Sequence, residues 1–167
     1  MEFNIRNEES KDLEQVRDVV RAAFPGEAES KLVDALRANG KATISLVAVK
    51  DDQVLGHVLF SPVSTSPPTE AKGIGLAPVA VLPAVQSQGI GSTLIREGLR
   101  LGKELGFDYC VVLGAPKYYE RFGFQKASPF GIRNEYGVDD EFMVIRFSGR
   151  GASGLVEYPW EFACFSV

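Results

Sequence analysis

The fold is decided by one stretch, Val79-Ala80-Val81-Leu82-Pro83-Ala84-Val85-Gln86-Ser87-Gln88-Gly89-Ile90-Gly91-Ser92-Thr93-Leu94. An apolar strand runs into a turn with two glycines, and the turn runs straight into a helix that has no side-chain cap in the usual place. The first N–H groups of a helix lack intrahelical partners, and the helix dipole adds about half a positive charge there. Gly89 and Gly91 carry no Cβ, so an anion can approach the backbone closely. The stretch predicts a phosphate-binding turn.

Two nucleotide-binding motifs do not fit this turn. No Lys-Ser/Thr pair follows the second glycine, and position 94 is Leu, so the turn is neither a Walker A loop nor G-x-G-x-x-G. A nucleoside triphosphate is therefore disfavoured. Residues 149–154 do fit G-x-G-x-x-G, but only 13 residues follow them, too few for a βαβ unit of roughly 30 residues. We expect a loop between two antiparallel strands there.

Periodicity outward from this stretch predicts a mixed α/β fold with a mixed sheet, in the order β-α-α-β-β-β-α-β-α-β-β. Apolar spacing of 3.6 residues predicts helices at 13–24, 28–38 and 89–105, with a short one at 117–121. Alternating or continuous apolar runs predict strands at 3–6, 43–49, 54–63, 74–82, 107–113, 142–147 and 156–165. Pro78 removes one ladder donor, so we expect a bulge or an unpaired stretch in the strand that contains it.

Length and composition limit the class of protein. A chain of 167 residues buries roughly 70% of its unfolded surface, enough for one core, so we expect a single domain over 1–167. No apolar run approaches the roughly 18 residues of a membrane span, and the first twenty residues lack the pattern of a signal peptide. We therefore expect no membrane partner and a cytoplasmic location.

Charge and rare residues limit the chemistry. With 18 Lys+Arg against 22 Asp+Glu the net charge is −4, and no basic stripe is present, so a nucleic-acid partner is not expected. Cys110 and Cys164 do not have metal or disulfide spacing, and we expect free thiols and no metal site. His57 is the single histidine and no G-x-S-x-G turn exists, which disfavours a serine hydrolase.

Two motifs resemble those of the GNAT superfamily of N-acetyltransferases. Gln86-Ser87-Gln88-Gly89-Ile90-Gly91 resembles the Q/R-x-x-G-x-G/A signature, preceded by Val79-Ala80-Val81-Leu82-Pro83 where the family has an L-x-V-x-P strand. Tyr118-Tyr119-Glu120-Arg121-Phe122-Gly123-Phe124 is similar to the family segment F-Y-x-x-x-G-F. The predicted order of elements also resembles the GNAT fold over nearly the whole chain.

The resemblance implies acetyl-CoA as co-substrate and a primary amine as acceptor. It places the cofactor on the backbone of Val79, Ala80 and Val81 and on Gln86, Gln88, Gly89, Ile90, Gly91, Ser92 and Thr93. It assigns Tyr119 to the family's general-acid position. A phenol of pKa about 10 protonates a thiolate of pKa about 8.5 only at a cost of about 2 kcal/mol, so we expect Tyr119 to act mainly by hydrogen bonding. A bulge at Pro78 would splay its strand from the next one and open a cleft for the cofactor arm.

The general base is left open by the sequence. An amine of pKa about 10.4 is neutral in roughly one molecule in 2,500 at pH 7, which costs about 4.6 kcal/mol. Glu27 and Glu29, between the first two helices, are the catalytic candidates, acting directly or through water, although each also suits a solvated helix start. His57 lies in an apolar strand and fits a core histidine better than a base, and Glu70 is a weaker candidate. If Glu27, Glu29 and Glu70 gather at the cleft, a cationic amine is favoured.

Two features depart from the family pattern. Many members carry an Asn about seven residues before the tyrosine, and Val112 occupies that position here. The segment 151–167 matches no motif; we expect it to close the sheet, with Tyr158 and Trp160 as alternative acceptor-pocket residues. Two rival readings stay open, a non-catalytic acyl-CoA sensor and a structural protein whose glycines serve only packing. A homodimer is also compatible with the sequence.

Overall fold

The computed structural model describes residues 1–165. Its helices are α1 (Leu13–Ala23), α2 (Ala28–Ala38), α3 (Ile90–Glu104), α4 (Pro116–Tyr119) and α5 (Glu161–Cys164). Its strands are β1 (Asn4–Asn7), β2 (Ile44–Lys50), β3 (Gln53–Ser66), β4 (Gly73–Val81), β5 (Tyr109–Leu113), β6 (Gln125–Lys126), β7 (Ile132–Asn134), β8 (Phe142–Arg146) and β9 (Gly154–Glu157). The mixed α/β class is confirmed, and α2 has the predicted bounds.

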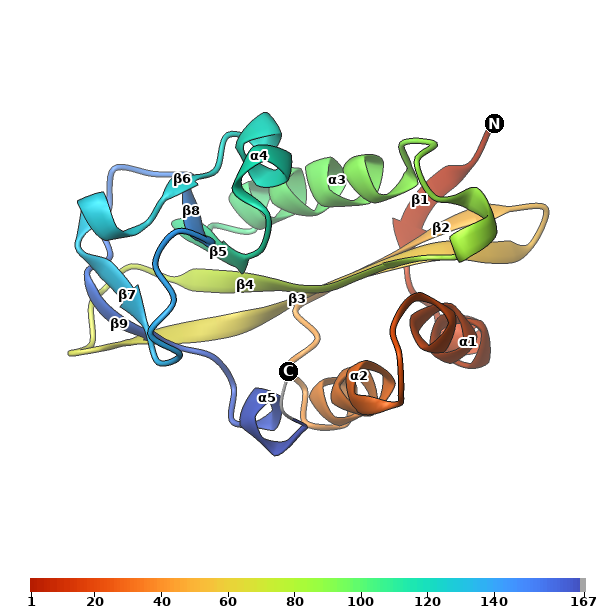
Figure 1. The fold of residues 1–167 in the computed structure, drawn as a ribbon, viewed down its shortest axis with the longest axis horizontal. Helices are drawn as coiled ribbons and strands as arrows, with labels where there is room; N and C mark the ends of the chain where they lie inside the picture. Colours follow the sequence, from red (N-terminus) through yellow and green to blue (C-terminus); the bar gives the residue numbers. More distant parts are fainter. Residues whose placement is uncertain (166–167) are drawn as a thin grey trace.

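The sheet lies between two helical layers (Figure 1). Its strand order is β1-β2-β3-β4-β5-β8-β6, and β9 pairs with the end of β3 and with β7. Pairing is antiparallel except for β4 with β5 and β7 with β9. One core joins the sheet to α1, α2 and the C-terminal aromatic residues, and a second core joins it to α3. The amphipathic faces read from the sequence therefore cover opposite sides of one sheet.

β4 and β5 run side by side for only part of their length. Three pairs join them, from Gly73 with Tyr109 to Gly75 with Val111. Beyond Gly75, β4 bulges against β3, because Val58 pairs with Val79 and Phe60 with Leu76, which leaves Ala77 and Pro78 opposite Leu59 alone. The predicted bulge at Pro78 is confirmed. The edge of β4 that faces β5 is unpaired from Leu76 to Val81, and a gap opens in the sheet there.

The C-terminal part of the chain differs from the prediction. A strand was expected over 156–165, but β9 ends at Glu157 and a short helix, α5, follows. Pro159 has no N–H to continue a ladder, and its carbonyl accepts a hydrogen bond from the N–H of Phe162, at 3.0 Å, which closes a turn. The rings of Tyr158 and Phe162 pack with their centres 5.1 Å apart. β6 and β7 are too short to give a periodic signal and were missed. Residues 149–153 form a loop, as predicted, and Gly154 begins β9. The two strands that the loop joins, β8 and β9, do not pair with each other.

A buried ion pair fixes α5 against the end of α2. The carboxylate of Glu161 is fully buried and accepts hydrogen bonds from Asn39 Nδ2 at 2.7 Å and Lys41 Nζ at 2.9 Å. Burial raises the pKa of this carboxyl, but the hydrogen bonds from Lys41 and Asn39 outweigh it and hold the pKa below its ordinary value. The C-terminal segment is thereby held in a defined position, although it carries no motif. In the part of the chain described here, no helix is long and apolar enough to cross a membrane.

Candidate active site

The glycine turn presents free backbone N–H groups at the start of α3. Gly89 adopts φ 85°, and no side chain caps the helix. The first helical bond runs from the N–H of Thr93 to the carbonyl of Gly89, at 3.0 Å. The N–H groups of Ile90, Gly91 and Ser92 therefore precede the first intrahelical donor, as predicted, at the end of the helix that favours negative charge.

A cleft of about 580 Å³ lies in front of these groups. It is lined by Ala23, Phe24, Val79, Val81, Gln86, Ser87, Gly89, Ile90, Gly91, Ser92, Tyr118 and Arg121. Seven of the ten residues predicted to bind the cofactor are among them: Val79, Val81, Gln86, Gly89, Ile90, Gly91 and Ser92. The other three, Ala80, Gln88 and Thr93, do not line it.

The positions of these three residues have local causes. Ala80 lies on the opposite side of the strand, where its side chain is buried in the core beneath α1 and α2. Gln88 is exposed ahead of the helix. Thr93 is exposed, and both its N–H and its hydroxyl already donate to the carbonyl of Gly89, the hydroxyl at 2.7 Å.

The cleft continues along the unpaired edge of β4. The N–H of Leu82 donates to the carbonyl of Leu55 in β3, at 2.9 Å. Because the backbone groups of successive strand residues point in opposite directions, the N–H and carbonyl of Val81 point away from β3. The carbonyl of Val81 on this edge accepts a hydrogen bond from Gln86 Nε2, at 3.1 Å. An extended ligand lying along β4 could therefore pair with its backbone as a neighbouring strand would.

Arg121 and Tyr118 line the cleft although the sequence prediction did not assign them. Arg121 donates from Nη2 to the Ser92 hydroxyl at 2.8 Å, and its guanidinium stacks 4.5 Å from the centre of the Tyr118 ring. The Tyr118 hydroxyl lies 3.5 Å from the position a Cβ on Gly91 would take. A basic residue inside the second motif, on a short helix, is the signal that would have pointed to Arg121.

Tyr119, the predicted catalytic tyrosine, does not line this cleft; it lies beside the turn that follows β5. Its ring occupies the space beside Gly114, which leaves no room for a side chain there, and it packs edge-on against Phe124 with ring centres 5.8 Å apart. Burial and the neighbouring Tyr118 raise the pKa of Tyr119 to about 12. The hydroxyl is therefore protonated at neutral pH. Val112, in the position of the family Asn, is buried in the core below α3.

The candidate bases do not gather at this cleft. Glu27 is exposed at the start of α2, 3.6 Å from Lys31 Nζ and 3.9 Å from Arg21 Nη2. Glu29 is half-buried on the same helix, and among residues 1–165 neither glutamate lines the cleft. Glu70 is exposed in the β3–β4 loop, beyond Gly73 and so away from the α3 end of β4.

His57 is a core histidine. It is fully buried, and its Nε2 lies 2.8 Å from the Ser45 hydroxyl. Burial and the charge of Arg37 lower its pKa to about 3, so the ring is neutral at physiological pH. In the described range 1–165, no three His, Cys, Asp or Glu side chains are close enough to hold a metal ion.

Comparison with known proteins identifies the family. The model of the Acetyltransferase (GNAT) family matches residues 13–124, which contain the glycine turn and the tyrosine segment. The chain belongs to the GNAT family of acetyltransferases. The resemblance seen in the two motifs is thereby confirmed.

Relatives of this acetyltransferase are similar over nearly its whole length. The N-acetyltransferase YhbS of Escherichia coli K12 is 38% identical over 166 residues, covering 96% of this chain and 99% of YhbS. The crystal structure of E. coli YhbS with CoA superimposes with a TM-score of 0.91 at 37% identity, over 96% of this chain and 92% of that one. A GNAT acetyltransferase of Brucella melitensis, crystallised with acetyl-CoA, gives a TM-score of 0.82 at 40% identity, over 96% and 98% of the two chains. The predicted GNAT fold is thus confirmed.

Proposed function

We propose that this acetyltransferase transfers the acetyl group of acetyl-CoA to a primary amine by direct attack in a ternary complex. The observation that carries the proposal is the set of N–H groups without helical partners at Ile90, Gly91 and Ser92, at the head of a cleft that continues along the unpaired edge of β4. The CoA and acetyl-CoA bound in two similar structures support it. Residues 1–167 would work as one domain, in the cytoplasm.

In this proposal acetyl-CoA lies in the cleft with its pyrophosphate at the start of α3 and its thioester at the gap between β4 and β5. Its pyrophosphate would accept hydrogen bonds from the N–H groups at the start of α3. It would also accept a charge-assisted hydrogen bond from Arg121, whose guanidinium is oriented by its hydrogen bond to the Ser92 hydroxyl. The pantetheine arm would pair with the backbone of β4 between Val79 and Val81. The thioester would then lie at the gap where β4 and β5 separate, beside Tyr119.

Tyr119 would stabilise the leaving thiolate. The amine nitrogen attacks the thioester carbonyl, a C–N bond forms, the C–S bond breaks and the sulfur leaves with the electron pair. A phenol with pKa about 12 would give its proton to a thiolate of pKa about 8.5 only at a cost of about 5 kcal/mol. Tyr119 therefore serves as a hydrogen-bond donor in this proposal. After attack the nitrogen loses one N–H proton to solvent and the thiolate takes up one from solvent, so the products are the amide and the CoA thiol. The proton that an ammonium acceptor loses before attack is a separate one.

The amine loses its proton to water in this proposal. Glu27 and Glu29 do not line the cleft, and His57 is sealed in the core. Loss of the proton to solvent before attack costs about 4.6 kcal/mol at pH 7 for an amine of pKa about 10.4. A water relay to either glutamate is the alternative, and it would appear as a titrating enzyme group in the pH profile.

Two measurements on the purified chain test the function. Calorimetric titration with acetyl-CoA should show micromolar or tighter binding, and thiol release should require an added amine. Tight binding without thiol release for any amine, peptide or polyamine would favour the acyl-CoA sensor instead. Failure to bind CoA at micromolar concentration would favour the structural reading.

A further inference from the structure

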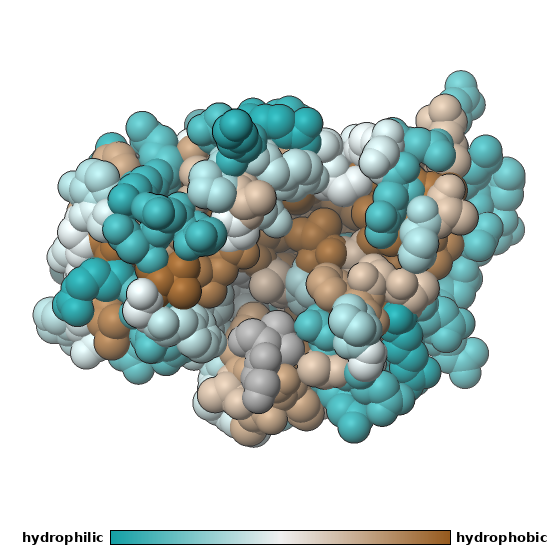
Figure 2. Space-filling view, in the orientation of Figure 1, coloured by the Kyte–Doolittle hydropathy of each residue, from teal (hydrophilic) through white to brown (hydrophobic). Residues whose placement is uncertain are grey.

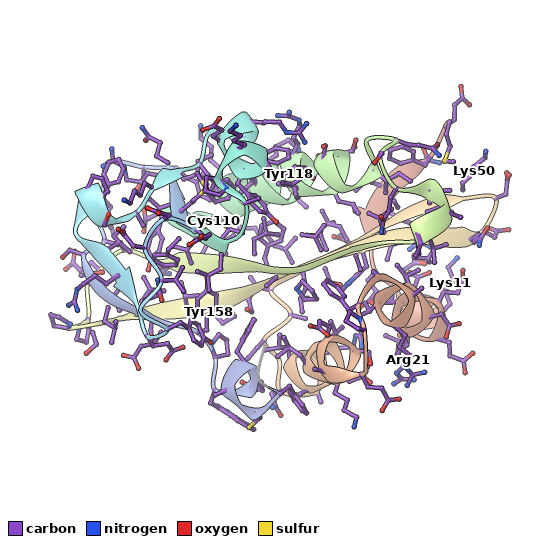
Figure 3. The ribbon with its side chains drawn as sticks, viewed as in Figure 1. Lys11, Arg21, Lys50, Cys110, Tyr118 and Tyr158 are labelled. Atoms are coloured by element: carbon purple, nitrogen blue, oxygen red, sulfur yellow. The ribbon has the colours of Figure 1, made fainter. Side chains whose placement is uncertain are left out.

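A second pocket opens on the side of the sheet that faces α1 and α2. It has a volume of about 150 Å³ and is lined by Leu76, Ala77, Leu113, Tyr136, Tyr158 and Phe162. All six side chains are apolar or aromatic. Figure 2 shows apolar surface reaching into the hollow between α4 and α5 on this face of the molecule. Figure 3 shows Tyr118 on α4, above β4, and Tyr158 on the other side of β4, toward α5.

The pocket lies at the gap between β4 and β5. Leu76 and Ala77 are the first residues of β4 beyond its last pair with β5, and Leu113 is the last residue of β5. Leu76 belongs to the core below α3, whereas Tyr158 and Phe162 belong to the core below α1 and α2. The pocket therefore borders the gap at which the thioester would lie in the proposed complex.

The floor of the pocket is buried and its mouth is open. Leu76, Tyr158 and Phe162 are between 2% and 8% exposed, whereas Leu113 and Tyr136 are 37% and 41% exposed. The Tyr158 ring lies against Gly75, with Cε1 2.8 Å from the place of a Cβ there, and the Tyr158 N–H donates to Glu135 Oε1 at 3.2 Å. Phe162 follows Glu161, whose buried ion pair with Lys41 holds α5 in place. The pocket is therefore formed before any ligand arrives.

The size and chemistry of the pocket select its ligand. A volume of about 150 Å³ is enough for a ring the size of benzene. Aromatic walls favour edge-on or stacked contact with a second ring. One extra methylene in an apolar pocket is worth about 10- to 200-fold in kcat/KM. Burying a group of this size in place of a methyl group should therefore raise kcat/KM by at least about 30-fold.

We propose that the acceptor is a primary amine joined by one to three carbons to an apolar group about the size of a phenyl ring, and that Leu76, Ala77, Leu113, Tyr136, Tyr158 and Phe162 bind this group. The inference rests on the proposed function, since it places the amine against the acetyl-CoA thioester. A free arylalkylamine and a peptide with an N-terminal aromatic residue share this chemistry.

A panel of amines tests the substrate class. Thiol release is measured with ethylamine, isopentylamine, phenethylamine and 1-naphthylethylamine, whose ammonium pKa values lie within about one unit of each other. We expect kcat/KM, calculated on the concentration of free amine, to be at least about 30-fold higher for phenethylamine than for ethylamine, and to fall for the naphthyl compound. Phenylalanyl-glycine against diglycine distinguishes the peptide source. Values for ethylamine and phenethylamine within threefold would overturn the proposal.

Two variants connect the effect to the pocket. Leu113→Trp fills the half-open mouth and should lower kcat/KM for phenethylamine at least tenfold while ethylamine changes less than threefold. Trp160→Ala, on the exposed side of α5 and 61% exposed, is the matched control and should change neither. An equal loss for both amines in Leu113→Trp would contradict the assignment.

A binding readout separates failure of this inference from failure of the proposed function. The CoA-loaded protein is titrated with N-acetylphenethylamine, which should bind at least tenfold more weakly to Leu113→Trp. If acetyl-CoA binds but neither this compound nor any amine of the panel is recognised, the pocket assignment is wrong and the cofactor site stands. If acetyl-CoA does not bind, the proposed function is wrong, and titration of the free protein with the same compound decides the pocket.

Discussion

The two sides of the gap between β4 and β5 are built in different ways. On the side of α3, the cleft presents backbone N–H groups, two glycines and Arg121. On the side of α5, the pocket presents six apolar or aromatic side chains. The first site uses main-chain groups that any sequence supplies once glycines allow access, whereas the second depends on the identity of each side chain. We infer that the α3 side fixes the donor and that the α5 side selects the acceptor.

The largest expected effect is a loss of acetyl-CoA affinity caused by a substitution on the α3 side alone. Gly91→Asp puts a carboxylate among the N–H groups that would hold the pyrophosphate, so we expect acetyl-CoA affinity to fall more than about 100-fold. An acidic residue in the first turn suits the helix dipole, and a Cβ at Gly91 meets its nearest neighbour, the Tyr118 hydroxyl, at 3.5 Å, so folding should be retained. Calorimetry gives the affinity. Gly149→Asp, at an open loop position, is the control and should bind normally.

The next effect concerns the point where the two sides meet. Tyr119→Phe removes the hydroxyl proposed to stabilise the thiolate, and we expect kcat to fall about 30-fold, the equivalent of one hydrogen bond to a charged group of about 2 kcal/mol. Tyr118→Phe, beside Gly91 and away from the thioester, should change kcat less than threefold. A turnover rate for Tyr119→Phe within about twofold of the wild-type rate would show that the tyrosine only packs against the sheet.

The pH profile tests whether the acceptor side contains a base. The pKa of His57 is about 3 and that of Tyr119 about 12, so neither group changes protonation between pH 6 and 9. With the free amine as the attacking species, kcat/KM should rise about tenfold per pH unit toward the pKa of the amine. A value of kcat/KM that does not change with pH over this range would instead reveal an enzyme base acting through water.

A smaller effect on KM for acetyl-CoA measures the contribution of the positive charge on the α3 side. Arg121→Gln removes the only positive charge among the residues 1–165 that line the cleft, and we expect KM for acetyl-CoA to rise about fivefold, the value of one exposed charge-assisted contact of about 1 kcal/mol. The salt dependence of binding should weaken as well. Arg100→Gln, on the exposed face of α3 and paired with Glu97 and Glu104, is the control and should leave KM unchanged.

The smallest effect on catalysis is expected for the ion pair that holds α5 in place, which should contribute to stability instead. Glu161→Gln leaves Lys41 beside a neutral group, so we expect the free energy of unfolding to fall by about 2 kcal/mol while KM for acetyl-CoA stays within twofold. The pKa of Glu161 lies below the ordinary 4.5, so this stabilisation is present above that pH and is lost as pH falls through the lower folded-state pKa. Urea unfolding at pH 7 and pH 4 measures both. Glu97→Gln, in an exposed pair with Arg100, should cost less than about 0.5 kcal/mol.

The contrast between the two sides also explains what the sequence could predict. The α3 side rests on local rules, so the glycine turn, the uncapped helix and the bulge at Pro78 followed from consecutive residues. The pocket joins Leu76, Leu113, Tyr136 and Phe162, which are far apart in the chain and carry no periodic signal. Tyr158 was a candidate and does line the pocket, whereas Trp160, two residues later, is exposed with its ring 5.4 Å from Lys41 Nζ. Trp160 is the N-cap residue of the one-turn helix α5, and its side chain faces solvent there.

One steady-state experiment tests most directly whether the α3 side binds acetyl-CoA and the α5 side binds the acceptor. KM for acetyl-CoA and KM for phenethylamine are measured in wild type, Gly91→Asp and Leu113→Trp. Gly91→Asp should raise only the acetyl-CoA value, and Leu113→Trp should raise only the phenethylamine value, each at least tenfold. If either variant raises both values to the same extent, the two sides of the gap do not act as separate donor and acceptor sites.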